Sequence, residues 1–215
     1  MNFDDFLKLA SKVKNIPLPA ETSQFKMSPP FRKQLQEANR AKMAIARQAG
    51  VMALFYPNTS YETTLVLILR KTYKGVHSAQ IGFPGGKLEL DDASIKAAAV
   101  RETFEEVGVP EQHIKVWREL TQVYIPPSNF FVTPFIGIVN NTPKLTKQDE
   151  EVEAIIEVPL TEFLDENNVI TQMVQTSYAI KTEVPAFYLQ GQTVWGATAM
   201  MLSEVKDLLK AATYS

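Results

Sequence analysis

The chain has 215 residues, with 22 Lys and Arg against 24 Asp and Glu, so its formal net charge is −2. Hydrophobic residues make up 45% of the sequence, which supplies a real core and excludes a disordered or fibrous protein. The sequence has no Cys, which excludes disulfides, thiolate nucleophiles, zinc fingers and iron–sulfur sites. With His77 and His113 as the only histidines, any bound metal must be held mainly by oxygen.

The N-terminal residues and the net charge limit where the protein is expected to reside and what it is expected to bind. Two acids, Asp4 and Asp5, stand near the start, and no apolar run is long enough for a membrane span. We therefore expect a cytoplasmic protein without a membrane partner. A nearly neutral chain also argues against nucleic acid as a partner. A small-molecule substrate is expected, and a homodimer is left open.

Hydrophobic periodicity predicts a mixed α/β domain with a helical start. An amphipathic helix is expected at 3–14, followed by a proline-containing extended arm, so we divide the chain into an N-terminal extension (1–40) and a main domain (41–215). The remaining expected elements are strands at 48–56, 63–69, 114–124, 131–139, 152–157 and 184–190, a Gly/Pro loop at 82–86, and helices at 92–107 and 195–212.

The central helix has recognisable ends and two distinct faces. Asp92 is expected to cap its N-terminus, and Gly108 to stop it. At about 100° per residue, Glu102, Glu105 and Glu106 share one face. An apolar stripe on the opposite side is expected to face the core; it consists of Ala97, Val100, Phe104 and Val107.

Three clustered carboxylates repel one another, and such a face alone is more often simply solvated. Its surroundings favour a metal site instead. Gly85 and Gly86 allow backbone to approach a ligand closely, and Arg101 stands beside the acidic face. A hard cation such as Mg²⁺ binds oxygen ligands and removes the repulsion.

The stretch from Gly86 to Val109 resembles the Nudix box of the Nudix hydrolases. Five residues separate Gly86 from Asp92, as in the general signature, but eight separate Asp92 from Arg101, one more than usual. This longer box looks like that of the coenzyme A pyrophosphatase branch. The run from His77 to Lys87 is similar to that branch too, with Ala79 where Gly is usual. Further likenesses lie at 124–130, 151–152 and 194–199.

The resemblance implies an α-β-α sandwich with a mixed central sheet, and an enzyme that hydrolyses diphosphate bonds with Mg²⁺ or Mn²⁺. By the same resemblance, Glu102, Glu105 and Glu106 are metal ligands, joined by the backbone of Gly86. The catalytic set comprises these three acids, Arg101, expected to orient a Glu, and Glu151. The base is left open between a box acid, with Glu102 as ligand or base, and the later Glu151. The residues expected to bind substrate are Arg70, Lys74, His77, Phe83, Gly85, Gly86 and Lys87.

Several roles have alternatives at this stage. Lys71 is a further candidate phosphate contact, and Tyr124, Phe130 and Phe131 either stack on adenine or pack in the core. Trp195 and Gly196 are expected to dock the last helix.

Three functions compete. The leading one is cleavage of coenzyme A or its derivatives to 4′-phosphopantetheine and adenosine 3′,5′-bisphosphate. The second is cleavage of ADP-ribose or another nucleoside diphosphate compound. The third is a non-catalytic nucleotide-binding Nudix module, which the three intact box acids disfavour.

Overall fold

A computed structural model describes residues 1–71, 80–175 and 181–213. Lys74 and His77, two of the predicted substrate contacts, lie outside these residues.

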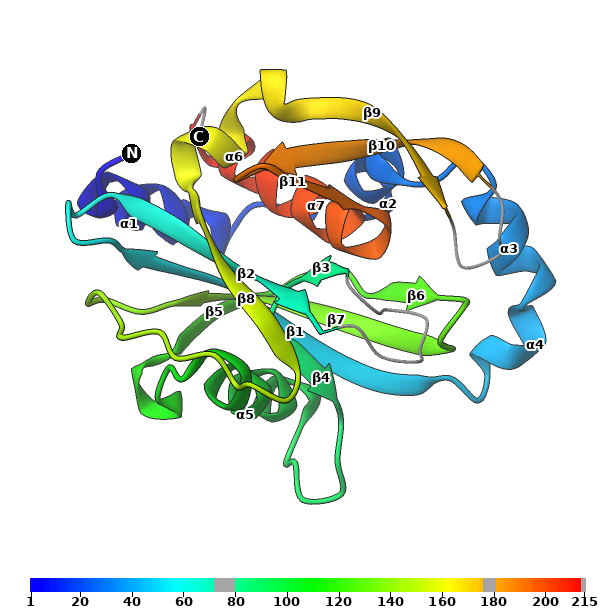
Figure 1. The fold of residues 1–215 in the computed structure, drawn as a ribbon, viewed down its shortest axis with the longest axis horizontal. Helices are drawn as coiled ribbons and strands as arrows, with labels where there is room; N and C mark the ends of the chain where they lie inside the picture. Colours follow the sequence, from blue (N-terminus) through cyan, green and yellow to red (C-terminus); the bar gives the residue numbers. More distant parts are fainter. Residues whose placement is uncertain (72–79, 176–180, 214–215) are drawn as a thin grey trace.

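A mixed sheet forms the centre of the described structure (Figure 1). Its middle strand, β1 (Arg47–Pro57), runs parallel to β7 (Phe130–Ile138) and antiparallel to β2 (Thr63–Arg70). Five further strands join by antiparallel pairing, namely β3 (Ile81–Gly82), β4 (Gly85–Lys87), β5 (Lys115–Glu119), β6 (Val123–Ile125) and β8 (Val152–Pro159).

Strand β1 is buried on both faces because its side chains alternate between two apolar clusters. Ala53 and Phe55 belong to one cluster, whereas Met52, Leu54 and Tyr56 belong to the other. A strand covered on both sides reads as a continuous apolar run. The run at 48–56 therefore identified the strand correctly.

Helices cover the two faces of the sheet, which confirms the expected α-β-α sandwich (Figure 1). Helix α5 (Ile95–Val107) packs against one face of β1. Helices α1 (Phe3–Val13) and α7 (Gly196–Thr213) contact each other and lie on the opposite side.

A second sheet of described residues contains β9 (Val169–Gln175), β10 (Lys181–Leu189) and β11 (Gln192–Trp195). Only β10 had been expected. The predicted strand at 114–124 is two strands, β5 and β6. The short helices are α2 (Ala20–Gln24), α3 (Arg32–Ala38), α4 (Arg40–Met43) and α6 (Leu160–Leu164), with 3₁₀ turns η1 (Phe25–Met27), η2 (Glu111–His113) and η3 (Glu166–Asn168).

The N-terminal residues share the core of the rest of the chain. Phe3 and Phe6 of α1 are fully buried, and the Phe6 ring centroid lies 4.9 Å from that of Phe55 in β1. The proline-containing stretch after α1 is not an extended arm, because it includes α2, η1 and α3. The boundary at residue 40 stays a prediction.

The start of α5 differs from the predicted one. The helix begins at Ile95, and its N-cap is Ser94, whose side chain accepts a 3.1 Å hydrogen bond from the backbone N–H of Ala97. Asp92 lies too far upstream to cap and has other partners. Gly108 ends the helix in the left-handed conformation, as predicted, with φ at 76°.

Replacing Ser94 by Ala should lower the free energy of unfolding by about 1 kcal/mol, because the N–H of Ala97 would lose its acceptor. Replacing it by Asp, which also caps, should leave stability nearly unchanged. Urea unfolding of both variants measures this. Equal stability of the Ala variant and the wild type would contradict the assignment of this cap.

None of the helices built from described residues combines the length and apolar character needed to cross a bilayer.

Candidate metal and diphosphate site

Two glycines bring the backbone of β4 against the acids of α5. Strand β4 pairs with β1, with Gly86 opposite Gly50 and Gly85 opposite Val51. Gly85 has φ of 144°, which side chains rarely adopt. A Cβ on Gly86 would lie 2.2 Å from the carboxyl carbon of Glu102. Glycine is therefore required for the observed approach of carboxylate and backbone.

The face of α5 that meets the sheet is not the predicted apolar stripe. Ala98, Ala99 and Thr103 are buried, whereas Phe104 is 47% exposed. Of the predicted stripe only Val107 is fully buried. The reason is Gly50 of β1, where an added Cβ would lie 2.3 Å from the backbone oxygen of Ile95. So close a contact suits small side chains and turns the acidic edge toward the β4 glycines.

Glu106 is the most buried of the three box acids, with a side chain that is 3% exposed. One carboxylate oxygen accepts a 2.7 Å hydrogen bond from the N–H of Gly85. The other lies 3.2 Å from Nη2 of Arg70 without the alignment of a hydrogen bond. Burial, and more weakly the charges of Glu102 and Glu151, raise the pKa of Glu106 to about 7, against the opposing effect of Arg70.

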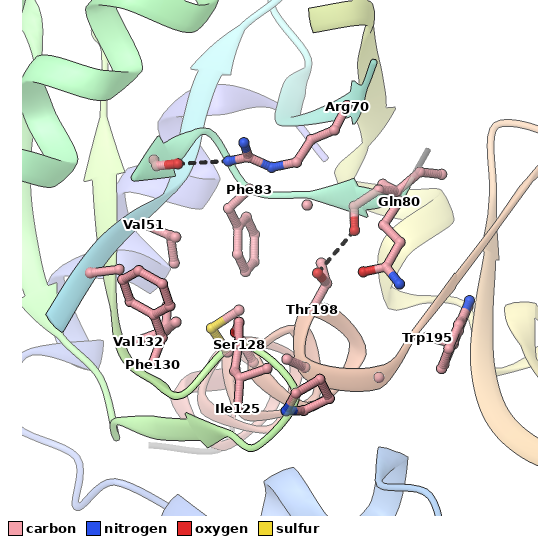
Figure 2. A pocket seen from close by; sticks show the side chains of 18 of the residues that line it. Val51, Arg70, Gln80, Phe83, Ile125, Ser128, Phe130, Val132, Trp195 and Thr198 are labelled. Atoms are coloured by element: carbon pink, nitrogen blue, oxygen red, sulfur yellow. Dashed lines mark hydrogen bonds between the residues drawn. The ribbon is translucent and has the colours of Figure 1, made fainter. Parts of the chain in front are cut away.

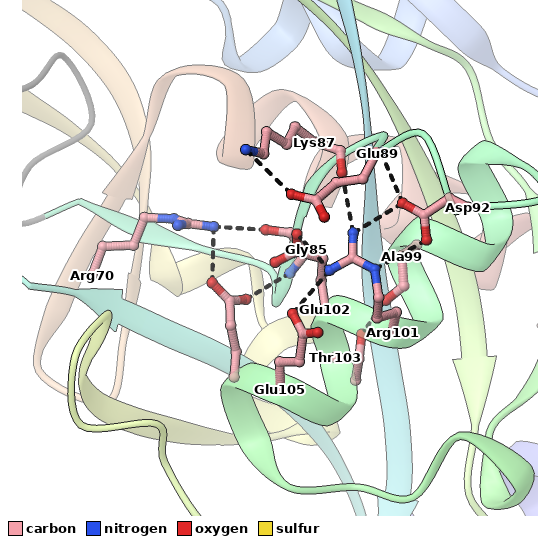
Figure 3. A network of polar contacts seen from close by, with 11 residues as sticks. Arg70, Gly85, Lys87, Glu89, Asp92, Ala99, Arg101, Glu102, Thr103 and Glu105 are labelled. Atoms are coloured by element: carbon pink, nitrogen blue, oxygen red, sulfur yellow. Dashed lines mark hydrogen bonds and ion pairs between the residues drawn. The ribbon is translucent and has the colours of Figure 1, made fainter.

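Glu102 and Glu105 are both held by Arg101, as Figure 3 shows. Nη1 of Arg101 lies 3.1 Å from Glu102 and 2.9 Å from Glu105. Burial raises the pKa of Glu102, an effect that Arg101 opposes. Glu105 is half exposed, and its side chain is the outermost of the three. The structure thus gives Arg101 the contacts that its predicted orienting role requires.

Asp92 fixes Arg101 in turn. Its two carboxylate oxygens accept from Nε at 3.0 Å and Nη2 at 2.9 Å of the guanidinium, a two-pronged pairing of high directional specificity. Asp92 also accepts from the N–H of Glu89. Hydrogen bonding from Arg101 lowers the pKa of Asp92, so the pair stays charged. Asp92 therefore pairs with Arg101 instead of capping α5.

Replacing Asp92 by Asn is expected to lower kcat about tenfold. Arg101 would lose one of the two carboxylate oxygens that accept its hydrogen bonds, and would hold the box acids less well. KM should change less than kcat. The adjacent and exposed Asp91, changed to Asn, is the matched control and should behave as wild type. Steady-state kinetics measure both, and equal kcat values for the two variants would refute the positioning role.

Glu151 lies close enough to the acids to affect them. Its charge contributes to the raised pKa values of both Glu102 and Glu106. It stands just before β8, and its backbone oxygen accepts from the N–H of Lys71 at 2.8 Å. The structure therefore brings this loop acid toward the box, while its role as a base stays a prediction.

A pocket of about 270 Å³ opens beside the β4 glycines (Figure 2). Arg70 and Lys87 line it next to Gly85 and Gly86, and with Phe83 this brings five of the predicted substrate contacts together. Arg70 donates to the backbone oxygen of Gly85 at 2.7 Å. Farther in, the wall is mainly apolar and aromatic, with Ile81, Phe83, Ile125, Phe130, Val132, Trp195 and Met201.

The aromatic residues divide between pocket and core. Phe83 and Phe130 line the pocket, and Trp195, at the end of β11 just before α7, does so as well (Figure 2). Tyr124 is instead packed against Phe131, with ring centroids 5.1 Å apart, and its hydroxyl donates to Asn129 at 2.8 Å. For Tyr124 and Phe131 the core-packing alternative fits the structure.

Sequence reasoning missed the part of the pocket formed by the N-terminal extension. Pro29, Phe31, Arg32 and Leu35 line it. The only available signal was an arginine and a phenylalanine directly after two prolines, in a stretch to which no site had been assigned.

The box acids fit a divalent cation by donor type and charge more than by arrangement. Within the described part of the chain, no three Asp, Glu, His or Cys side chains form a group able to hold a metal ion. Glu102 and Glu105 are paired with Arg101 rather than gathered around one point. Yet Glu106 keeps a buried oxygen with no hydrogen-bond donor, and burial raises the pKa of this carboxyl. Donor type and charge therefore fit a hard cation.

Known proteins resemble this chain in sequence and in fold. Residues 46–176 match the family model of the NUDIX domain. An uncharacterized Nudix hydrolase, NudL, from Yersinia pestis (strain Pestoides F) is 33% identical over 141 residues, covering 66% of this chain and 70% of the relative. NudL from Yersinia pseudotuberculosis serotype O:1b (strain IP 31758) matches with the same identity and coverage.

Among solved structures, the Nudix hydrolase RenU from M. smegmatis superposes with a TM-score of 0.53 at 14% identity, over 77% of this chain and 87% of that one. At this identity the likeness concerns the fold alone, and it agrees with the sandwich described above.

Proposed function

Since this chain belongs to the Nudix hydrolase family, we propose that it hydrolyses the diphosphate bond of coenzyme A or one of its derivatives. Water adds its oxygen to one phosphorus, and the bridging oxygen leaves with the other phosphate. The products are 4′-phosphopantetheine, or its acylated form, and adenosine 3′,5′-bisphosphate.

One observation carries the proposal: a single pocket extends from the β4 glycines beside the box to an apolar and aromatic wall. At one end Arg70, Lys87 and the β4 glycines suit the oxygens of a diphosphate. At the other end, side chains such as Phe83 and Trp195 suit a base or an aliphatic arm. A substrate with phosphates and a long, partly apolar body matches both ends.

The residues that would hold a cation are Glu102, Glu105 and Glu106, with the backbone of Gly86. When bound, Mg²⁺ or Mn²⁺ offsets charge on the diphosphate oxygens and lowers the pKa of the attacking water.

The other residues position these groups or move the proton. Arg101, fixed by Asp92, orients Glu102 and Glu105. Arg70 ties Glu106 to the β4 backbone. Glu151 is the candidate acceptor of the water proton, since it approaches the acids from a separate loop.

The test is a substrate panel with Mg²⁺ or Mn²⁺ in which products are identified by mass spectrometry. Coenzyme A should yield the two products above, and hydrolysis in ¹⁸O water should place one heavy oxygen in one of them. A chelator should stop turnover. Absence of these products, together with rapid cleavage of ADP-ribose or a dinucleotide, would replace the proposal with the broader nucleoside diphosphate activity. Nucleotide binding without any cleavage would favour the non-catalytic module.

A further inference from the structure

The turn between β6 and β7 forms one part of the pocket wall. Pro127 and Ser128 of this turn line the pocket, together with Ile125 before it and Phe130 after it. Figure 2 shows Ser128 beside Ile125, on the side of the pocket away from Arg70. Ser128 therefore brings a hydroxyl into a part of the wall that is mainly apolar.

The Ser128 hydroxyl is buried, and no hydrogen-bond partner is present for it within the described structure. Burying a hydroxyl without a partner lowers the stability of the folded chain, and an alanine in the same place would avoid this cost. Residues that are unfavourable for folding are typical of functional sites. A serine in this pocket wall is therefore explained by ligand binding better than by folding.

The backbone of the turn is held firmly on both sides of this hydroxyl. The carbonyl oxygen of Ser128 accepts a 3.4 Å hydrogen bond from Nη2 of Arg47, and that of Asn129 accepts from the N–H of Arg47 at 3.0 Å. The side chain of Asn129 accepts from the hydroxyl of Tyr124 at 2.8 Å. Ser128 is thus fixed before a ligand binds, and a rotation about its Cα–Cβ bond suffices to turn the hydroxyl toward one.

An aromatic ring lies next to this turn. Phe130 lines the pocket, and the guanidinium carbon of Arg47 lies 4.2 Å from its ring centroid. A ring held in this way offers a flat surface on which a heterocyclic base stacks favourably. The edge of a base carries hydrogen-bond donors and acceptors, and a serine hydroxyl can serve as either. An aromatic ring with a hydroxyl two residues away therefore matches a base better than an aliphatic chain.

We propose that Ser128 and Phe130 bind the base of the substrate, with Phe130 stacking on the ring and the Ser128 hydroxyl bonded to its edge. The inference rests on the proposed function, in which the base is adenine and the diphosphate lies at Arg70 and the β4 glycines. Ser128 thereby determines specificity for the base.

The experiment measures binding and stability of the full chain. Calorimetry follows adenosine 3′,5′-bisphosphate, which carries the base, and 4′-phosphopantetheine, which does not. Ser128→Ala should weaken binding of the adenosine ligand about three- to tenfold, because one hydrogen bond is lost, and leave that of 4′-phosphopantetheine unchanged. Its Tm should equal or exceed the wild-type value, since no hydrogen bond of the unliganded protein is removed. Phe130→Leu should also weaken binding of the adenosine ligand.

Ser60→Ala, in the exposed turn between β1 and β2, is the matched control and should change neither binding nor Tm. The inference is overturned if the wild type does not bind the adenosine ligand, or if Ser128→Ala binds it unchanged. Weaker binding of 4′-phosphopantetheine alone would overturn it too, and would assign this wall to the other half of the substrate. A lower Tm of Ser128→Ala would show a structural role instead. If coenzyme A is not cleaved, the proposed function fails, but binding of the adenosine ligand still decides the role of Ser128.

Discussion

Replacing Glu106 by Gln is expected to lower kcat about a thousandfold. Gln has the size and shape of Glu, so the pocket and the contact with the N–H of Gly85 can persist through its carbonyl oxygen. What disappears is the negative charge, which a divalent cation needs and which Arg70 balances. Because the carboxylate is buried beside other acids, removing its charge should cost little stability, and Tm should stay within a few degrees of the wild-type value.

The same change at Glu102 should give a loss of similar size, and binding of Mn²⁺, followed by calorimetry without substrate, should weaken in both variants. Glu111 on the exposed turn η2 supplies the control, and its change to Gln should affect neither turnover nor Mn²⁺ binding. Full activity in both the Glu102 and the Glu106 variants would mean that the catalytic cation is held elsewhere. Normal Mn²⁺ binding with lost activity would assign these acids to proton transfer instead.

Much of the fold could be predicted because the central elements obey local rules. Strands β1 and β2 are unbroken apolar runs, and such runs are typical of strands that are buried on both faces. Gly108 marked the end of α5 correctly because the left-handed backbone conformation at that position favours glycine. The short strands β3, β4 and β11 are held by their pairing with longer neighbours, so nothing in their own sequence signals them.

The three acids could be placed on one face of α5, but not the direction in which that face points. A helical wheel gives angles between side chains and says nothing about the neighbouring surface. The prediction that Phe104 faces the core was wrong, since Phe104 is exposed, and the burial of Glu106 could not be read from the wheel. The deciding residues, Gly50 and Gly86, lie on other strands, and their effect appears only when the backbones are brought together.

The N-cap of α5 could not be predicted from the sequence for a similar reason. Both Asp92 and Ser94 are good N-caps by residue type, and sequence alone does not choose between them. The choice is made by Arg101, which is nine residues away in the sequence but adjacent in space and pairs with both oxygens of Asp92. The place of Arg32 in the pocket wall was missed for a related reason, since the other walls of the pocket are far away in the sequence.

Gly86→Ala is the change that tests this spatial argument most directly, and it should lower kcat about a hundredfold. The new Cβ would lie 2.2 Å from Cδ of Glu102 and 2.3 and 2.5 Å from its two oxygens, far inside contact distance. The atoms that the new Cβ would meet belong to the Glu102 side chain, so this side chain can move aside while the backbone of β4 stays in place. Glu102 must therefore leave its place beside Arg101, and activity should fall far more than stability.

Gly191, in the turn between β10 and β11, provides the control, since an added Cβ there has nothing within 4 Å. Its change to Ala should cost about 1 kcal/mol of stability, because φ is positive, and leave kcat unchanged. A double-mutant cycle with Glu102→Gln sharpens the test. If Gly86→Ala acts by displacing Glu102, it should add little to the loss already caused by Glu102→Gln. Independent, multiplicative losses would place the effect of Gly86 on the backbone of β4 and not on the carboxylate that it faces.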